Sequence, residues 1–190
     1  MPTKKDNILS AAEILFGHYG IRKTTMDEIA HKAHMSKSAL YYYFKNKEDI
    51  FAEIIQKDLN IFKVKMEKVL NKAKTPQSKM YTYIKNRMTH LKELVNFYKT
   101  LRDEYLEHYI FVENIRKDFA KYEQDLLTTL LKEGIQKNVF YLTNINSTVR
   151  MISIALKGLE DELFLKHGTK DIETDGAEMF GLILKGIEAR

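Results

Sequence analysis

Proline and glycine are scarce in this chain, and their scarcity limits what it can fold into. The 190 residues contain two prolines, Pro2 and Pro76, and eight glycines. Because these residues are the common breakers of helices, few points remain at which a helix must end. Apolar residues recur at helical spacing along most of the chain, and no sustained stretch alternates apolar and polar residues as a half-buried strand does. The sequence therefore predicts an all-α protein.

Composition favours a cytoplasmic protein. The chain is 44% hydrophobic and 30% charged, which suits one large domain or two small ones. No apolar run approaches the roughly 18 residues of a membrane span, and the N-terminal MPTKKDNIL lacks the apolar core of a secretion signal. The lack of cysteine excludes disulfides and thiolate metal sites. A net charge of +5 is compatible with a phosphate-backbone partner without requiring one, and we expect no membrane partner.

Cap residues divide the first 50 residues into short helices. Ser, Thr and Asn side chains cap helix starts, and a Thr followed three residues later by Glu forms a capping box, as at Thr25 and Glu28. Three short helices and the start of a long one result. Two adjacent short helices joined by a tight turn form a helix-turn-helix, whose second helix enters the DNA major groove. The predicted caps are Thr3, Thr25, Ser36 and Asn46, and the predicted stops are Gly20, His34 and Phe44.

The rest of the chain predicts longer helices, for about nine in total. A fourth helix covers about residues 47–72, and Thr75-Pro76 signals the start of the next one. Its stripe is so regular that the following break can only be placed between residues 96 and 112. Further stripes cover residues 115–130, 149–163 and 180–187.

The second helix of the helix-turn-helix lies in the stretch MSKSALYYYFKNKED, residues 35–49. Leu40 and Phe44 are four residues apart and share one face, which is predicted to pack against Ile29 and Ala33. One tyrosine ring should lean on this core. The outward groups include an ammonium, a hydroxyl and phenols, which can bond base edges or phosphates. They belong to Lys37, Ser38, Tyr42 and Tyr43.

This pattern resembles the TetR family of bacterial transcription regulators over about 50 residues. The resemblance implies base contacts from Lys37, Ser38 and Tyr42. It implies phosphate contacts from Thr25, Tyr41, Tyr43 and Lys47. The matching residues are Ile8, Ala12, Leu15, Phe16, Gly20, Thr24-Thr25, Ile29-Ala30, Ser36, Leu40-Tyr41, Phe44 and Lys47-Glu48.

One position departs from the family pattern. His34 stands where family members usually have glycine in the turn. A residue there often needs a positive φ, which histidine tolerates better than a β-branched residue. We expect a modest stability cost or a slightly altered turn.

The resemblance also implies a DNA-binding domain at residues 1–48 and an effector-binding and dimerisation domain at residues 49–190. A small, largely apolar or aromatic effector would bind among the helices of the second domain. Ordinary core is the alternative for each candidate residue taken singly. The candidates are Phe62, Met66, Met88, Phe97, Tyr98, Tyr105, Phe119 and Tyr122.

The last two helices are predicted to form a dimer surface, since Ala155, Gly158, Gly181 and Gly186 permit close helix approach. Two recognition helices about 34 Å apart would read a palindromic operator. Intrachain core remains the alternative for about half of the candidates. The candidates are Ile152, Ala155, Leu156, Leu159, Leu163, Phe180, Ile183, Leu184 and Ile187.

Other functions have weaker support. Asp27, His31 and His34 have the spacing of metal ligands, but their helix is predicted to end near His34 and the histidines would flank DNA, so a structural role is favoured. Glu104 and His108 have the spacing of a ligand pair or acid–base couple, but solvated charge is the simpler interpretation. Neither a metal nor a cofactor is expected. A phosphate loop, HExxH and GxSxG are absent from the sequence, so we expect no enzyme. The predicted function is a homodimeric repressor released by an effector; the alternative is a helical small-molecule-binding protein with a vestigial DNA-binding unit.

Overall fold

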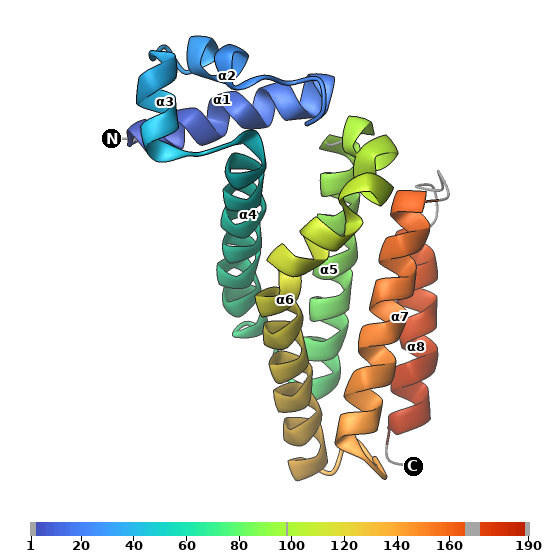
Figure 1. Ribbon diagram of the computed structural model, residues 1–190. Coiled ribbons are helices and arrows are strands. Elements are labelled where there is room, and N and C mark those ends of the chain that lie inside the picture. Colours follow the sequence, from blue (N-terminus) through green and yellow to red (C-terminus); the bar gives the residue numbers. More distant parts are fainter. Residues whose placement is uncertain (1–2, 98, 166–171, 189–190) are drawn as a thin grey trace. The chain divides into compact units, whose positions relative to one another are not determined.

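The chain folds into α-helices. The computed structural model describes residues 3–97, 99–165 and 172–188 (Figure 1). The predicted all-α class is confirmed, and no helix among these residues is long and apolar enough to cross a membrane. The helices are α1 (Lys4–Tyr19), α2 (Met26–Lys32), α3 (Lys37–Tyr43), α4 (Lys47–Leu70), α5 (Pro76–Phe97), α6 (Lys99–Gln136), α7 (Ile145–Leu165) and α8 (Ile172–Ile187).

The described residues contain eight helices where the sequence predicted about nine. Helix α5 ends at Phe97, inside the predicted window for a break. The next helix, α6, then continues for 38 residues without a second break. The single break predicted between residues 96 and 112 is therefore confirmed, and the described residues contain one helix fewer than the predicted total.

Two compact units can be distinguished. The first comprises Met1–Ile61 and Leu94–Arg116, and the second comprises Phe62–Glu93 and Lys117–Arg190. Helices α4, α5 and α6 each contribute residues to both units. The domain boundary at residue 48 stays a prediction.

Side chains cap the three short helices of the first unit as predicted. Thr3 accepts from the backbone N–H of Asp6 at 3.1 Å, and the Asp6 carboxylate accepts from the Thr3 N–H at 3.1 Å. Thr25 and Glu28 form the same reciprocal pair, at 3.3 and 2.8 Å. The Ser36 hydroxyl accepts from the N–H three residues on at 3.2 Å. Each cap contributes about 1 kcal/mol, which matters for helices as short as α2 and α3.

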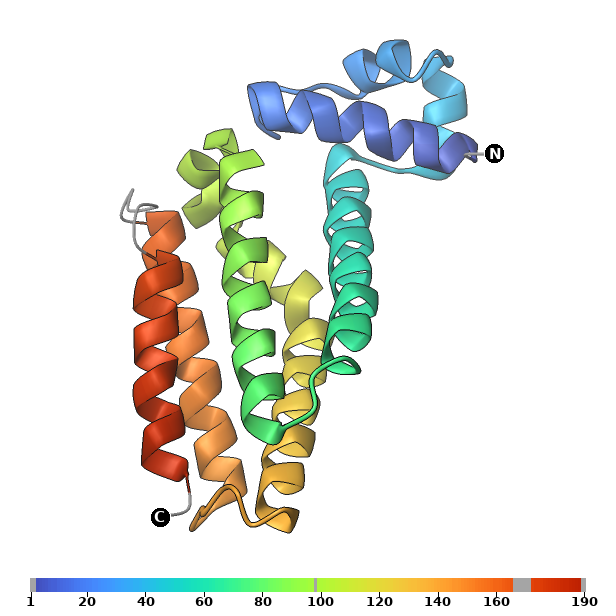
Figure 2. The same ribbon diagram turned by 180° about the vertical axis from the view of Figure 1, so that it is seen from behind.

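A single hydrophobic core joins α1, α2, α3 and the first turns of α4, which lie together in Figure 2. Phe16 of α1 meets Phe51 of α4 edge to face, with ring centroids 5.8 Å apart. Burial of this set fixes the direction of α3 within the unit. The core consists of Ile8, Leu9, Ala12, Phe16, Ile21, Ile29, Ala30, Leu40, Phe44, Ile50, Phe51 and Ile54.

The second unit has an aromatic core with charged groups inside it. Phe62 stacks on His90 at 4.6 Å and meets Phe119 at 5.8 Å between ring centroids. Helices α7 and α8 lie side by side in both views (Figures 1 and 2).

Arg87 of α5 is the centre of the charged cluster in this unit. Its guanidinium donates to Glu123 of α6 at 3.1 Å and to Glu160 of α7 at 2.9 Å. The hydroxyl of Tyr83 also donates to Glu123. Arg87, Glu123 and Glu160 are 3%, 8% and 1% exposed, so the cluster connects three helices inside the core.

Candidate nucleic-acid interface

A tight turn at residues 33–36 joins α2 to α3. His34 in this turn has φ 55°, the left-handed conformation that the sequence analysis associated with the position. The N–H of His34 donates to the carbonyl of His31 at 3.1 Å, and the N–H of Met35 donates to the carbonyl of Ala30 at 3.0 Å. The turn is therefore formed without glycine, and the histidine carries local backbone strain.

The inner face of α3 packs as predicted. Leu40 is fully buried and Phe44 is 6% exposed, and both belong to the same core as Ile29. Ala33 packs against this core from its edge. Because the inner face is fixed in this way, the opposite face of α3 has a defined direction.

The outer face of α3 carries exposed tyrosines. Tyr42 is 84% exposed, Tyr41 45% and Tyr43 37%. The rings of Tyr42 and Tyr43 meet edge to face with centroids 5.3 Å apart. Tyr43 is the most covered of the three, but none of them is buried, because Phe44 occupies the core position. Lys37 and Ser38 are exposed on the same helix.

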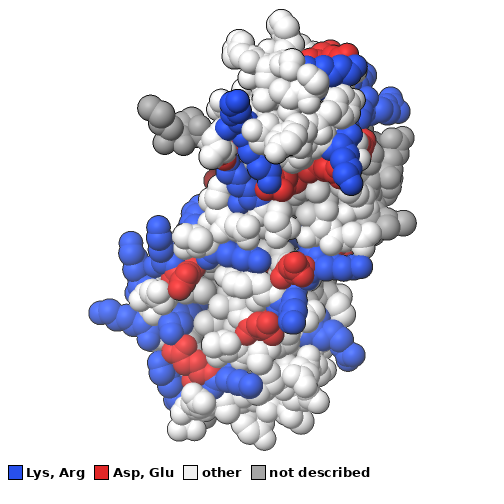
Figure 3. All heavy atoms as spheres, turned by 60° about the vertical axis from the view of Figure 1, so that its left-hand side comes forward, with Lys and Arg blue, Asp and Glu red and all other residues white. Residues whose placement is uncertain are grey.

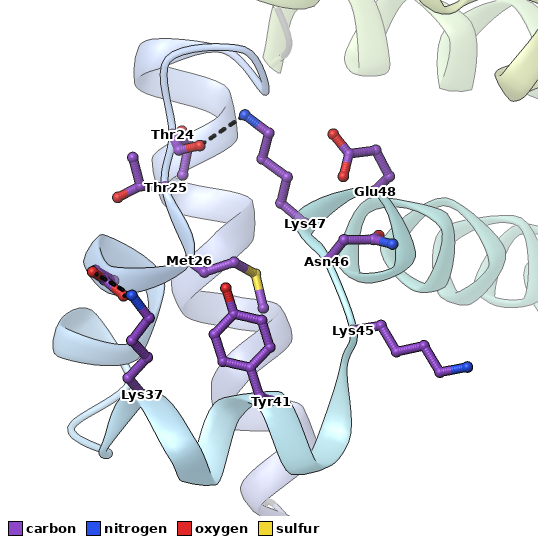
Figure 4. A pocket seen from close by; sticks show the side chains of 10 residues that line it. Thr24, Thr25, Met26, Lys37, Tyr41, Lys45, Asn46, Lys47 and Glu48 are labelled. Atoms are coloured by element: carbon purple, nitrogen blue, oxygen red, sulfur yellow. Dashed lines mark hydrogen bonds and ion pairs between the residues drawn. The ribbon is translucent and has the colours of Figure 1, made fainter.

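A cavity of about 370 Å³ is bordered by the loop before α2 and by the starts of α2, α3 and α4 (Figure 4). Four of the residues predicted to contact DNA line it, namely Thr25, Lys37, Tyr41 and Lys47. Figure 4 shows the Tyr41 ring pointing from α3 towards Met26. Lys45 and Asn46 also line the cavity. The sequence analysis did not assign them a DNA contact, although they adjoin Lys47.

Two of these residues have structural roles. The ammonium of Lys47 donates to the backbone carbonyls of Arg22 and Thr24, at 2.9 and 3.0 Å. It therefore fastens the loop between α1 and α2 to the start of α4. The backbone N–H and the hydroxyl of Thr25 both donate to the carboxylate of Glu28, and these bonds lower the pKa of Glu28. Phosphate contact by Lys47 and Thr25 stays a prediction.

Lys37, the first residue of α3, forms an ion pair with Asp27 of α2. Its Nζ lies 2.9 Å from Oδ1 and 3.0 Å from Oδ2 of Asp27. The hydrogen bond that Lys37 donates to Asp27, and the negative charge of Asp27, raise the pKa of Lys37, so the lysine stays protonated. The pair was not foreseen, because the two residues are ten positions apart across a turn. The observed neighbour of the Asp27 carboxylate is thus the ammonium of Lys37.

The metal alternatives gain no support. In the part of the chain that the structure describes, no three His, Asp or Glu side chains are grouped to hold a metal ion. The side chains of Glu104 and His108 lie outside the described residues.

Charge on this unit is mixed. On the face drawn in Figure 3, the upper part formed by α1 to α3 carries Lys and Arg side chains with Asp and Glu among them. The cavity shows the same mixture, with Lys37, Lys45 and Lys47 beside Asp27 and Glu48. The positive charge close to α3 is therefore partly cancelled by carboxylates.

Comparison with known proteins finds relatives of the first 50 or so residues and solved structures of the same fold. A family profile described as bacterial regulatory proteins, tetR family, matches residues 8–54. QacR of Staphylococcus aureus is 47% identical over 51 residues, 27% of each chain. IcaR of Staphylococcus epidermidis, the negative transcriptional regulator of the biofilm operon icaADBC, is 36% identical over 56 residues, 30% of each chain. A solved transcriptional regulator from Cytophaga hutchinsonii is 28% identical with a TM-score of 0.79, covering 96% of this chain and 97% of that one. Residues 8–54 of this chain are thus similar to the TetR family of bacterial regulatory proteins.

The matches to QacR and IcaR span less than a third of the length of those relatives. The family profile, at residues 8–54, includes α2, α3 and the turn between them. The long helices beyond α4 correspond to known proteins through the structural comparison.

Most of the described effector candidates are core residues of the second unit. Phe62, Met66, Met88 and Phe119 are each at most 2% exposed. Tyr122 is half-buried and lines a groove of about 350 Å³ between the end of α4, the start of α5 and α6. The ammonium of Lys63 lies 5.1 Å from its ring centroid. Tyr98 and the side chains of Phe97 and Tyr105 lie outside the described residues.

The dimer candidates divide between two sides of α7 and α8. Ile152, Leu156 and Phe180 are each 1% exposed, so they are buried within the single chain. Ala155, Leu159, Ile183, Leu184 and Ile187 are partly exposed, and the side chain of Leu163 lies outside the described residues.

Different residues carry the outward face of these helices. Met151, Ile154 and Leu182 are 57%, 64% and 72% exposed. A Cβ added at Gly158, Gly181 or Gly186 would meet no atom within 4 Å.

Proposed function

We propose that this chain is a DNA-binding transcription regulator of the TetR type and not an enzyme. We further propose that it acts in the cytoplasm and recognises a palindromic operator as a homodimer. The observation that carries the proposal is the outer face of α3. Lys37, Ser38 and Tyr42 are exposed there on a helix whose other face is buried. A short helix anchored on one face and polar on the other suits the major groove. Repression is the favoured direction, because IcaR is named a negative regulator.

The contacts divide by chemistry. Lys37, Ser38 and Tyr42 read base edges, with the lysine directed to guanine and the tyrosine ring to a thymine methyl. Tyr41 and Tyr43 donate their hydroxyls to phosphates on either side. Lys47 uses two of its three N–H groups on backbone carbonyls and keeps one for a phosphate. Thr25 lies beside it at the cavity and makes a further backbone contact.

Selection of bound sequences from a random pool of DNA duplexes tests the proposal. We expect an enriched palindrome that is bound at least about 10³-fold more tightly than random DNA at the same salt concentration. Lys37→Ala and Tyr42→Ala should each weaken operator binding by about 1–3 kcal/mol, measured by fluorescence anisotropy.

Two matched controls remove similar groups elsewhere. Tyr141→Ala removes a tyrosine that is 79% exposed in the second unit, and Lys68→Ala removes an exposed lysine of α4. Neither should change discrimination between operator and random DNA. Binding that enriches no motif and disappears with salt would contradict the proposal. It would favour the alternative, a small-molecule-binding protein with a vestigial DNA-binding unit.

The outward face of α7 and α8 is the proposed dimer contact. Its three large apolar side chains, Met151, Ile154 and Leu182, are exposed in the single chain, and three glycines leave space beside them. A second copy related by a two-fold axis would cover the same face on both chains. The partly exposed members of the predicted set, such as Leu159 and Ile183, lie at the edge of this contact.

A small, largely apolar or aromatic effector is proposed to release the operator. The groove beside Tyr122 provides apolar walls from Leu126 and Leu130, with Lys63 and Glu67 as polar groups. Helix α4 supplies one wall of the groove and is continuous with residues that follow the recognition helix. A coupling of about 1–3 kcal/mol would weaken operator binding 5- to 150-fold. An effector that raises the melting temperature without changing operator affinity would contradict this mechanism.

A further inference from the structure

The ion pair between Asp27 and Lys37 places a carboxylate beside the proposed DNA-reading face. Lys37 opens α3, and Asp27 lies in the first turn of α2. The two Asp27 oxygens lie 2.9 and 3.0 Å from the ammonium, and both side chains remain about 60% exposed, at 62% and 60%. Figure 4 shows the bond at the rim of the cavity, on the same side as Tyr41.

Protein stability gives little reason for this pair. Exposed ion pairs add little to the free energy of unfolding, because water screens them and ordering two long side chains costs entropy. The start of α2 is already closed by the reciprocal bonds of Thr25 and Glu28. A carboxylate at a DNA-facing surface also repels phosphates, so its effect on DNA binding has to be considered.

We propose that Asp27 is a specificity-determining residue, which holds and neutralises the ammonium of Lys37 so that this lysine adds little to the binding of random DNA. The inference rests on the proposed function and deepens it. The ammonium has three N–H groups, and the geometry assigns up to two of them to Asp27. The pair orients the remaining N–H, which can donate to guanine O6 or N7 where one of these atoms lies within reach.

Neutralisation of the Lys37 ammonium should affect the complex with random DNA differently from the complex with the operator. On random DNA a free lysine would swing to the nearest phosphate and release a counterion, whereas a lysine held by Asp27 does not. On the operator, the held lysine meets its acceptor without a search among rotamers. Asp27 thus lowers random binding more than operator binding, which widens the ratio between them.

The Asp27→Asn variant tests the inference, since it removes the charge and keeps the shape. Affinity for a random duplex should rise on the order of five- to tenfold near 0.1 M salt, the effect of one added phosphate contact. The plot of log affinity against log salt for random DNA should steepen by about 0.9. The operator affinity should change less, so the ratio of operator to random affinity should fall several-fold.

Two further variants serve as controls. Asp125→Asn makes the same charge change on an exposed residue of α6, and it should leave the salt slope for random DNA unchanged. Adding Lys37→Ala to Asp27→Asn should return the slope to the wild-type value, because the freed lysine is then missing. Circular dichroism melting of each variant verifies that it is folded.

The outcomes separate this inference from the proposed function. If the wild-type chain prefers a palindrome and Asp27→Asn leaves both the ratio and the random-DNA slope unchanged, the inference is overturned and the regulator function stands. The same holds if Asp125→Asn steepens the slope equally. If the wild-type chain prefers no sequence, the proposed function is overturned, and the inference with it.

Discussion

At the scale of single residues, the turn before α3 contains His34, where members of the TetR family usually have glycine, and the turn still forms. His34 holds a φ of 55°, where a side chain other than glycine crowds the backbone. The backbone bonds on both sides of the turn keep it closed. Because the path of the chain is preserved, we expect His34 to lower the free energy of unfolding and not to alter the turn.

Substitution of His34 by glycine should stabilise the protein. The left-handed conformation costs a non-glycine residue about 1–2 kcal/mol, and the flexibility of glycine in the unfolded chain offsets part of the gain. We expect the free energy of unfolding to rise by about 0.5–1 kcal/mol, measured by urea denaturation. Lys32→Gly, in the last turn of α2, is the control and should lower it by a similar amount. Equal losses in both variants would mean that His34 is not strained.

The residues of the outer face of α3 were foreseen because a helix whose inner face is fixed by Leu40 and Phe44 leaves no choice for the other side. Asp27 was not foreseen as the partner of Lys37. Its bond to Lys37 depends on how two helices cross, and no local spacing in the sequence carries that information. Lys47 shows a different limit. Its place at the start of the fourth helix was foreseen, but its bonds to backbone carbonyls could not be predicted without the path of the loop between α1 and α2.

At the scale of helices, Arg87 connects α5, α6 and α7 through Glu123 and Glu160. Arg87→Met should lower the free energy of unfolding by about 3–5 kcal/mol, because two buried carboxylates lose their counter-charge. Thermal and urea unfolding would measure it. Lys157→Met removes a partly exposed lysine 3.4 Å from Glu160, and it should cost less than about 1 kcal/mol. Recovery of stability when Glu123→Gln and Glu160→Gln are added to Arg87→Met would support this cause, and no recovery would contradict it.

Sequence patterns predicted most helix starts correctly because caps act locally. Thr3, Thr25 and Ser36 each bond the N–H groups that the pattern assigns to them. The region around residues 96–112 was harder, since it contains neither glycine nor proline and its stripe has no gap. The charged cluster at Arg87 had no signal in the sequence, because its members lie far apart along the chain and each resembles an ordinary surface residue.

At the scale of the whole molecule, the proposed dimer would bring two copies of α3, instead of one, to the proposed operator. Ile154→Glu combined with Leu182→Glu should dissociate the dimer, since each carboxylate would be buried against an apolar partner face. We expect each substitution to cost about 2 kcal/mol or more of association free energy, measured by sedimentation equilibrium. Ile61→Glu alters another isoleucine that is 59% exposed, and it should leave the dimer intact. A double variant that remains dimeric would place the contact elsewhere.

The dimer face shows why assembly is difficult to predict from one chain. Helices α7 and α8 have apolar residues on two sides, one for the core and one facing outward. Helical spacing identifies apolar stripes but does not say which stripe the chain covers itself. Ile152, Leu156 and Phe180 are covered by their own chain, and the exposure of Ile154 and Leu182, on which the proposed contact rests, could be read only from the structure.

The two bonds from Lys47 to the loop between α1 and α2 should also affect how often this loop opens. A loop of a few residues would ordinarily open on its own, far more often than the helices around it. Two of its carbonyls are held by the ammonium of the residue that begins α4. Opening of the loop and fraying of the first turn of α4 are thereby joined into one cooperative event. The loop leads directly to Thr25, the cap of α2, so the start of α2 should open together with the first turn of α4.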